Sequence, residues 1–342
     1  MKEEVIEFEN MMDSMLKCQQ GVRWKPQVKN YIINGAEDVY KQVASLKDGS
    51  WKNSTPQEIF IPYPKPRPGL SIPFKDRIYQ RSINDNVLYP AMTRSFIDSN
   101  CACQTCKGTD YARKIVKKYL WRHYRNHGLN GYIMQLDIKG YYPSMRHDKV
   151  YEMFRAKLDA DVCEDVEDIL EKQGTDGTGF YPGSQMVQIA GISLPGKVDH
   201  TIKEKCGIKN YVRYMDDFWM LHVSYEALSD CLDIVRRELE SLGFTLHEKK
   251  TVIKPLTDGF RFLGFNYRIT DTGKVIMSLT SENIKHERRK LRRMAKKVKR
   301  GEMDKAKADE CYRGWKAHAV KGTSHKLILR MDSYYKSLYQ EV

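Results

Sequence analysis

The sequence lacks an apolar run long enough to cross a lipid bilayer. Its 342 residues are 41% hydrophobic and 30% charged, and no uncharged stretch approaches the ~18 residues that a membrane helix needs. The first residues, MKEEVIEFEN, carry acids where a secretory signal peptide needs bases. These absences predict a folded cytoplasmic protein without a membrane partner.

The cysteines do not form the pattern of a disulfide scaffold. A chain of this length has no need of such a scaffold, so its eight cysteines are predicted to be reduced thiols. One subset approaches zinc-finger spacing: Cys103-x₂-Cys106, followed by His123-x₃-His127. A long helix would have to fold back to bring these four residues together, so structural zinc is kept as an alternative.

Acidic residues are too few to balance the basic ones. The chain has 58 Lys and Arg against 44 Asp and Glu, a net charge of +14. The last 62 residues, 281–342, hold 18 basic and 8 acidic residues, so they contribute 18 − 8 = +10. Such a basic segment predicts a polyanionic partner, most often nucleic acid. A solvated helix face is the alternative.

Proline is also scarce, and five of the 12 prolines fall in residues 61–77. That segment, IPYPKPRPGLSIPFKDR, is predicted to be largely extended. Apolar spacing predicts helices over 78–98, 110–125, 148–158, 184–203, 226–242 and 283–300. Strands are predicted over 131–138, 260–269 and 274–279, with one hairpin at 211–221 and another around residues 271–273. The order predicts an α+β fold with a split β-α-β-β unit.

The segment YVRYMDDFWML, residues 211–221, places two adjacent carboxylates in an apolar and aromatic run. Burying unpaired carboxylates is costly, so Asp216 and Asp217 mark either a polar turn or a site for a cation. Asp137 ends the strand predicted over 131–138. If the three acids converge, Mg²⁺ would suit their oxygens, and two ions would support in-line phosphoryl transfer.

Seven segments, in order, resemble the motifs of reverse transcriptases. The catalytic pair is GYIMQLDIKGYYPSM and YVRYMDDF. The others are LSIPFKDRIYQR, CKGTDYA, GSQMVQ, LGFTLHEKKT and FRFLGF. The resemblance covers about residues 59–270. It implies a right-hand polymerase fold, with fingers and an N-terminal extension in 1–130, a palm in 131–275 and a basic helical thumb in 276–342.

The resemblance also implies a metal site and a catalytic lysine. Asp137, Asp216 and the backbone of Ile138 would hold two Mg²⁺ ions, with Mn²⁺ as an alternative, and Asp217 would complete the site. Lys250 matches the lysine that protonates the leaving pyrophosphate, although an ordinary surface lysine is the alternative.

Further matches concern the substrates. Tyr142 matches the steric gate against a 2′-hydroxyl, with packing in a Tyr-rich turn as the alternative. The residues matched to the nucleotide site are Lys65, Arg67, Arg77 and Gln188. Those matched to the primer terminus are Phe262, Leu263 and Gly264. The helix within 285–300, with ten Lys and Arg, would lie along the template–primer backbone.

One motif departs from the common family pattern. Pro182 stands where the family often has Gln, and Val187-Gln188 replaces a Ser-Pro pair. The Gly-x-x-x-Ser-Gln form of this motif is typical of diversity-generating retroelement enzymes and defence-associated bacterial groups, but Val187 departs from it. The departure leaves the nucleotide-pocket contacts and the fidelity open.

The resulting prediction is a compact stand-alone bacterial reverse transcriptase. It would copy a dedicated non-coding RNA into DNA from deoxynucleotides in phage defence. The alternatives are a diversity-generating retroelement enzyme, a template-independent DNA polymerase and a catalytically inactive RNA-binding scaffold. The oligomeric state is left open.

Overall fold

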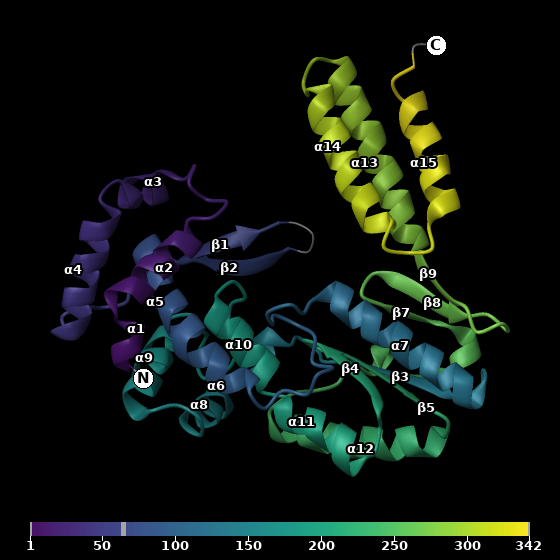
Figure 1. Ribbon diagram of the computed structural model, residues 1–342, viewed down its shortest axis with the longest axis horizontal. Coiled ribbons are helices and arrows are strands. Elements are labelled where there is room, and N and C mark those ends of the chain that lie inside the picture. Colours follow the sequence, from purple (N-terminus) through teal and green to yellow (C-terminus); the bar gives the residue numbers. More distant parts are fainter. Residues whose placement is uncertain (1, 63–65, 341–342) are drawn as a thin grey trace. The chain divides into compact units, whose positions relative to one another are not determined.

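The computed structural model describes residues 2–62 and 66–340 (Figure 1). Close approaches between Cα atoms divide the chain into two compact units, each made of several stretches of sequence. The first comprises Met1–Ala112, Gln135–Phe218 and Ser229–Thr251, and the second comprises Arg113–Met134, Trp219–Leu228 and Val252–Val342. Across the described residues, no helix is both long and apolar enough to cross a membrane.

The first unit begins with short helices. They are α1 Lys2–Val5, α2 Phe8–Cys18, α3 Pro26–Ile33, α4 Gly35–Lys47, α5 Phe74–Ile83 and α6 Tyr89–Thr93, with the π-helical turn η1 Asn84–Leu88 before α6. Helix α2 contacts α5, and Met11 and Ile78 on these helices are completely buried. Removing a side chain of this size from water stabilises the fold by about 2 kcal/mol.

The proline-rich segment forms the antiparallel hairpin of β1 Gln57–Ile61 and β2 Arg67–Ser71, with Phe60 opposite Pro68. The extended structure predicted for residues 61–77 is confirmed at Ile61 and over Arg67–Ser71, whereas residues 74–77 are helical. Helix α5 begins earlier than predicted, directly after Pro73, whose φ of −54° suits the entry to a helix.

The next helices are α8 His147–Arg155, α9 Ala160–Glu171, α10 Gln185–Ser193 and α11 Gly196–His200, continued by the π-helical turn η3 Thr201–Lys205. The prediction of one helix over 184–203 was wrong. The chain leaves helical geometry at Pro195, with ψ of 11°, because proline has no N–H to continue the ladder. Helix α9 was missed, although Val162, Val166 and Ile169 are buried at helical spacing.

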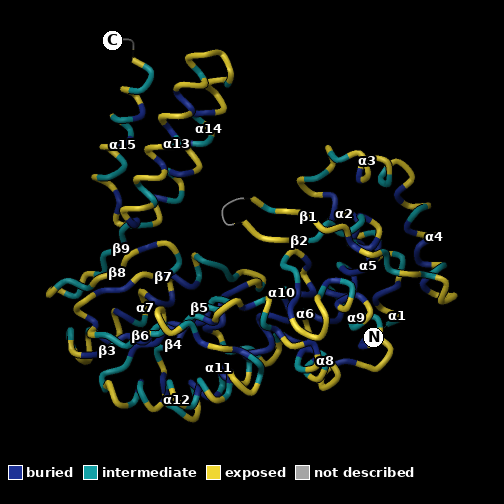
Figure 2. Tube along the Cα trace, turned by 180° about the vertical axis from the view of Figure 1, so that it is seen from behind, coloured by how far each residue is buried: buried dark blue, intermediate teal, exposed yellow. Residues whose placement is uncertain are grey.

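A four-stranded sheet has the order β4-β5-β3-β6, with β4 Asn210–Tyr214, β5 Asp217–His222, β3 Tyr132–Asp137 and β6 Val252–Pro255. The predicted strand over 131–138 and hairpin over 211–221 are confirmed, and β4 and β5 are buried along most of their length (Figure 2). The chain also forms the long helices α7 Thr109–His127 and α12 Tyr225–Ser241. Gly243, with φ of +87°, lies just beyond the end of α12, as predicted.

The second unit contains an antiparallel sheet of β7 Phe260–Phe262, β8 Phe265–Ile269 and β9 Val275–Leu279. The prediction of one strand over 260–269 was wrong, because Leu263 and Gly264 have φ of 45° and 84° and turn the chain back. The remaining helices are α13 Ser281–Lys299, α14 Lys305–Ala319 and α15 His325–Ser337. Thr280 caps α13 by accepting the Asn283 N–H at 3.3 Å.

Candidate active site

The turn between β4 and β5 presents Asp216 and Asp217. Strand β4 ends at Tyr214, Met215 has a positive φ of 56°, and Asp217 is the first residue of β5. Both aspartates are partly exposed, whereas residues 211–213 and 218–221 on either side are buried. Buried strands therefore fix the two acids at a turn that solvent reaches.

Asp137 is the last residue of β3, the strand next to β5. The His247 N–H donates to the Asp137 carbonyl at 2.8 Å, and the Lys139 N–H donates to the Thr245 carbonyl at 2.9 Å. These bonds hold the segment 245–250 against the end of β3. The 3₁₀ turn Glu248–Lys250 follows, and Nζ of Lys250 lies 2.8 Å from Oδ2 of Asp137.

The positive charge of Lys250 interacts with all three acids. Its hydrogen bond to Asp137 is the largest cause that raises its pKa above the ordinary value, and the charges of Asp217 and Asp216 raise it further. The structure therefore brings Asp137, Asp216, Asp217 and Lys250 into one electrostatic cluster within the first unit. At neutral pH the lysine is protonated and can donate.

The donor chemistry of this cluster fits a hard divalent cation. Carboxylate oxygens are the ligands that Mg²⁺ takes, and a positive charge, the Lys250 ammonium, already stands beside Asp137. The side chain of Ile138 is buried, and its backbone pairs with Leu246. Within the described part of the chain, no three His, Cys, Asp or Glu side chains are grouped so as to hold a metal ion.

A cavity of about 490 Å³ opens beside Asp216, and Arg67 and Tyr142 also line it. Its size lies in the range of small-molecule sites. The Tyr142 ring packs near Gly191, where an added Cβ would come to 3.3 Å from Cε1 of the tyrosine. Burial raises the pKa of Tyr142 above its ordinary value, so the hydroxyl stays neutral. The structure thus places Arg67 and Tyr142 in the same cavity as Asp216.

Two of the other residues matched to the nucleotide site line different cavities. Arg77 lines a second cavity, of about 370 Å³, and Gln188 lines a third, of about 530 Å³. Lys65 lies outside the described residues. The structure therefore does not bring Arg77 and Gln188 into the cavity beside Asp216.

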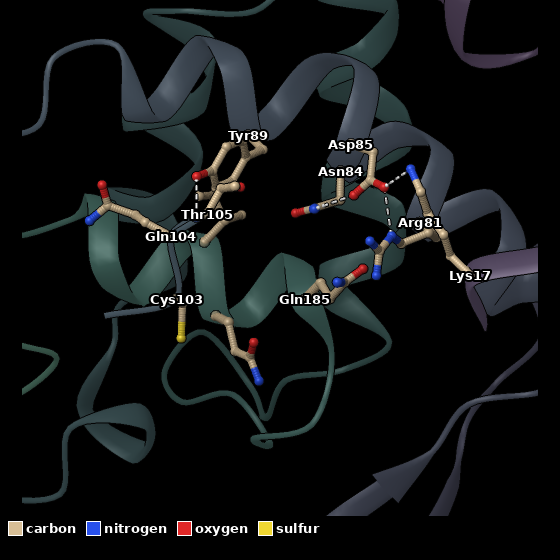
Figure 3. A pocket seen from close by; sticks show the side chains of 11 residues that line it. Lys17, Arg81, Asn84, Asp85, Tyr89, Cys103, Gln104, Thr105 and Gln185 are labelled. Carbon is tan, nitrogen blue, oxygen red and sulfur yellow. Dashed lines mark hydrogen bonds and ion pairs between the residues drawn. The ribbon is translucent and has the colours of Figure 1, made fainter. Parts of the chain in front are cut away.

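Sequence reasoning missed the residues shared by the second and third cavities, which are Lys17, Arg81 and Gln185. Asp85 accepts from Lys17 at 3.0 Å and from Arg81 at 2.7 Å (Figure 3). Arg81 follows Arg77 by one helical turn, a spacing that could have identified it. Lys17 carries no such signal.

In the second unit, the turn of Leu263 and Gly264 is supported by Arg113. This arginine is 4% exposed, donates to the Leu263 carbonyl at 3.4 Å, and lies with its guanidinium 5.2 Å from the Phe265 ring centre. The segment matched to the primer terminus is therefore a tight turn that the buried Arg113 side chain stabilises. Sequence reasoning did not find Arg113.

Helix α13 has a basic outer face. Leu291, Met294 and Ala295 are buried, while a groove of about 520 Å³ is lined by His286, Arg289, Arg292, Arg293 and Lys296. Cations repeated at this spacing along one helix form a surface for a polyanion.

The alternative zinc site has no support in the contacts of its histidines. Cys103 and Cys106 are exposed, with φ of 49° and 60°. His123 is buried, and its Nε2 lies 2.8 Å from the Asn130 carbonyl oxygen, so that nitrogen is already engaged. The His127 ring centre is 5.1 Å from that of His123.

A protein-family comparison matches residues 57–267, more than half of the chain, to the family described as reverse transcriptase (RNA-dependent DNA polymerase). No curated protein matches the chain in sequence. Similar solved structures include Candida albicans telomerase in complex with a fragment of telomeric RNA, at 14% identity and a TM-score of 0.47, covering 67% of this chain and 46% of that one. Apo telomerase from Candida tropicalis is 14% identical with a TM-score of 0.49, covering 70% of this chain and 53% of that one. The chain thus spans about half the length of these relatives.

Proposed function

The chain belongs to the reverse transcriptase family, and from that premise we propose that it copies an RNA template into DNA. The predicted α+β class and right-hand polymerase fold are confirmed. We assign the fingers to residues 1–130, the palm to 131–275 and the thumb to 276–342, as the sequence predicts.

The observation that carries the proposal is the ion pair of Lys250 with Asp137, at a lysine whose pKa the charges of Asp216 and Asp217 also raise. Nζ of Lys250 lies 2.8 Å from Oδ2 of Asp137. An ordinary polar turn does not need an acid from another strand and a lysine from a third segment. Such a cluster suits the handling of a triphosphate and the cations that accompany it.

In the proposed reaction, the primer 3′-hydroxyl loses its proton to water and its oxygen forms a bond to the α-phosphorus of a deoxynucleotide. The bond from that phosphorus to the bridging oxygen breaks and releases pyrophosphate. Asp137, Asp216 and the Ile138 backbone would hold two Mg²⁺, or Mn²⁺, with Asp217 completing the site. Such ions, when bound, stabilise the charge on the attacking and leaving oxygens. Lys250 then gives its proton to the departing pyrophosphate.

Tyr142 and Arg67 would select and hold the nucleotide. The tyrosine ring would exclude a 2′-hydroxyl, and the arginine fork would bind phosphate oxygens. Both line the cavity beside Asp216, which supports these roles. The assignments of Lys65, Arg77 and Gln188 to the same nucleotide remain predictions.

The nucleic acid would contact the second unit. The Phe262–Gly264 turn would seat the primer terminus, and the α13 groove would follow the phosphate backbone. Contacts of this kind position a duplex without reading its sequence.

For the biological role, we propose a bacterial cytoplasmic enzyme that copies a cognate non-coding RNA in phage defence. The phrases CACQ, KGTD and YYPSM support this context. The motif from Pro182 to Gln188 resembles, apart from Val187, a form typical of both diversity-generating retroelements and defence-associated groups. Sequencing the RNA that co-purifies with the protein separates the two. A single non-coding RNA supports defence, whereas a template repeat of a variable gene supports the retroelement.

The activity is tested by primer extension with Mg²⁺, supplying each deoxynucleotide singly and all four together. RNA and DNA templates are compared in the presence of the co-purified RNA. We expect each template base to direct the incorporation of its complement. Incorporation without regard to the template would indicate a template-independent polymerase, and no incorporation would indicate a binding scaffold.

A further inference from the structure

The guanidinium of Arg213 is completely buried behind the catalytic turn. Arg213 is 0% exposed, and its partner Asp199, in α11, is 1% exposed. A buried charge is tolerated only when it is paired and its hydrogen bonds are satisfied. Here Arg213 lies three residues before Asp216, and no requirement of sheet formation explains a buried charge at that position.

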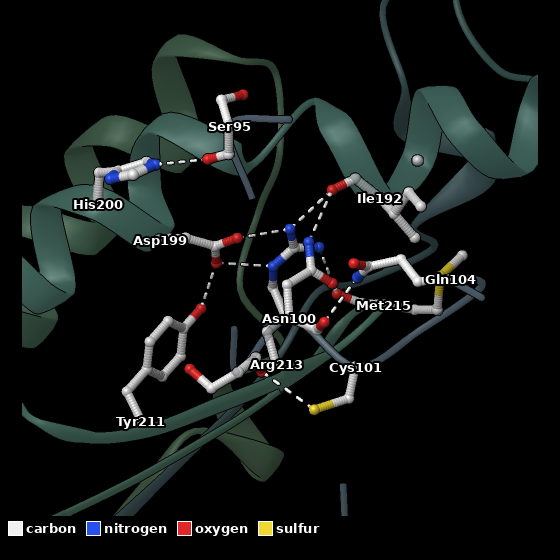
Figure 4. A network of polar contacts seen from close by, with 12 residues as sticks. Ser95, Asn100, Cys101, Gln104, Ile192, Asp199, His200, Tyr211, Arg213 and Met215 are labelled. Carbon is white, nitrogen blue, oxygen red and sulfur yellow. Dashed lines mark hydrogen bonds and ion pairs between the residues drawn. The ribbon is translucent and has the colours of Figure 1, made fainter. Parts of the chain in front are cut away.

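Arg213 uses its fork to join separate elements (Figure 4). Nε and Nη2 donate to the two carboxylate oxygens of Asp199, each at 2.7 Å. Nη2 also donates to the Ile192 carbonyl in α10 at 2.7 Å, and Nη1 donates to the Met215 carbonyl at 3.3 Å. One side chain therefore ties α11, α10 and the turn together.

Asp199 is itself anchored from β4. The Tyr211 hydroxyl donates to its Oδ1 at 2.6 Å (Figure 4). Burial raises the pKa of Tyr211 well above its ordinary value, so the hydroxyl keeps the proton that it donates. Tyr211 and Arg213 thus hold one carboxylate from the same face of one strand.

The Arg213 backbone is fixed as well. Its N–H donates to the Ser99 carbonyl at 3.0 Å, and its carbonyl accepts from the Cys101 N–H at 2.9 Å. With both backbone and side chain held, Arg213 has little freedom to move away from Met215. That residue has a positive φ, a conformation that a side chain such as methionine adopts at a cost of about 1 kcal/mol or more.

We propose that Arg213, Asp199 and Tyr211 form a positioning network that fixes the Met215–Asp216 turn, so that Asp216 and Asp217 are presented in one geometry to the metal ions of the reaction. This inference rests on the proposed function. It adds that the network acts through the turn, because none of the three side chains belongs to the carboxylate cluster. Lysine cannot replace Arg213, because one ammonium cannot reproduce the planar fork that reaches the carboxylate and two carbonyls.

The test measures metal binding directly, without catalysis. Mn²⁺ alone is titrated into the protein, and the free ion is followed by electron paramagnetic resonance. Asp216→Asn measures the binding that occurs elsewhere on the chain. The variants are Arg213→Lys and Tyr211→Phe, and the matched control is Arg155→Lys, whose side chain is 63% exposed and forms an ion pair with Glu167.

We expect Arg213→Lys to weaken Mn²⁺ binding about tenfold and Tyr211→Phe to weaken it by a smaller factor, as for residues that orient metal ligands. The kcat for incorporation should fall in parallel, while the KM for the deoxynucleotide stays within about twofold of wild type. The control should match wild type in both respects. A role in folding alone would lower the folded fraction but not the Mn²⁺ affinity of the folded molecules.

Wild-type Mn²⁺ affinity in folded Tyr211→Phe overturns the proposal, whatever the behaviour of Arg213→Lys. Folding of each variant is checked by circular dichroism. If the wild-type protein binds Mn²⁺ but extends no primer, the proposed polymerase function fails while the binding comparison still tests the network.

Discussion

At the scale of single residues, the site depends on how charges are compensated. Asp137 is 17% exposed and is paired with Lys250, which is 54% exposed. The sequence could identify these residues only through their resemblance to family motifs, because no local pattern links positions 137 and 250. The link is made by the backbone bonds between residues 137–139 and 245–247. Arg213 lies within the segment YVRYMDDFWML, residues 211–221, but the sequence did not reveal that its charge is buried.

The role of Lys250 as an acid predicts a change in pH dependence. Its raised pKa keeps the wild-type side chain protonated through the neutral and mildly alkaline range. In Lys250→His the acid would have a pKa near 6.5, so the incorporation rate should fall as the pH rises above about 7. Single-turnover rates from pH 6 to 9 check this. If the Lys250→His variant shows the same dependence of rate on pH as the wild type, Lys250 is not the acid in the reaction.

Tyr142 is predicted to discriminate between sugars. Tyr142→Ala should raise the relative kcat/KM for ribonucleotides over deoxynucleotides by at least about tenfold, because the ring no longer fills the cavity beside Asp216. Tyr142→Phe keeps the ring and should retain the wild-type preference. The measurement is the ratio of kcat/KM for matched ribo- and deoxynucleotides on one RNA template. An unchanged ratio in the alanine variant would show that the ring only packs.

At the scale of elements, periodicity predicted most of what the structure contains. Helix α12 was predicted from apolar residues three and four apart, and it ends at Ser241, two residues before the glycine at 243 that was predicted to follow it. Two of the errors arose where one residue interrupts a continuous pattern. Pro195 divides the predicted helix over 184–203, and Gly264 turns the predicted strand over 260–269 into a hairpin. In each case the apolar spacing continued across the break, so hydrophobicity alone gave no warning.

Helix α7 contains a buried histidine that makes stability depend on pH. Burial lowers the pKa of His123 below its ordinary value of 6.5. As the pH falls below that value, the unfolded chain takes up a proton that the folded chain does not, so stability falls. His123→Gln should flatten this dependence between pH 7 and 5, by no more than about 1.4 kcal/mol per pH unit.

Chemical denaturation at several pH values measures this effect, and exposed His325→Gln serves as the control, with the wild-type slope. A His123→Gln slope equal to that of wild type would show that another group causes the acid sensitivity.

At the scale of the whole molecule, the charge distribution is the feature that sequence predicted most directly. The net charge of +14 is concentrated in the last 62 residues, and α13 carries it on an outer groove. The sequence could not show which cations line that groove, because this depends on how Leu291 and Met294 pack. It also could not place Arg77 and Gln188, which line cavities other than the one beside Asp216.

This groove predicts a salt-dependent contribution to nucleic-acid binding. Replacing Arg289, Arg292, Arg293 and Lys296 with Gln should lower the slope of log affinity against log salt, by up to about 0.9 for each phosphate that the helix no longer neutralises. The matched control removes the same charge at exposed positions of α14 and α15, namely Lys305, Lys307, Arg313 and Lys326. Binding of an RNA–DNA duplex is measured by fluorescence anisotropy from 50 to 300 mM salt. Equal slopes in the two variants would show that total charge, rather than the groove, attracts the duplex.

The central claim is that Asp137, Asp216 and Asp217 perform nucleotidyl transfer on an RNA template. The most direct measurement is the rate of adding one complementary deoxynucleotide to a primer on a defined RNA template, by rapid quench. The protein is compared with Asp216→Asn and with Asp230→Asn, which changes an exposed carboxylate of α12. The account predicts that Asp216→Asn loses at least about a hundredfold in rate while Asp230→Asn retains the wild-type rate. A wild-type rate in folded Asp216→Asn would contradict it.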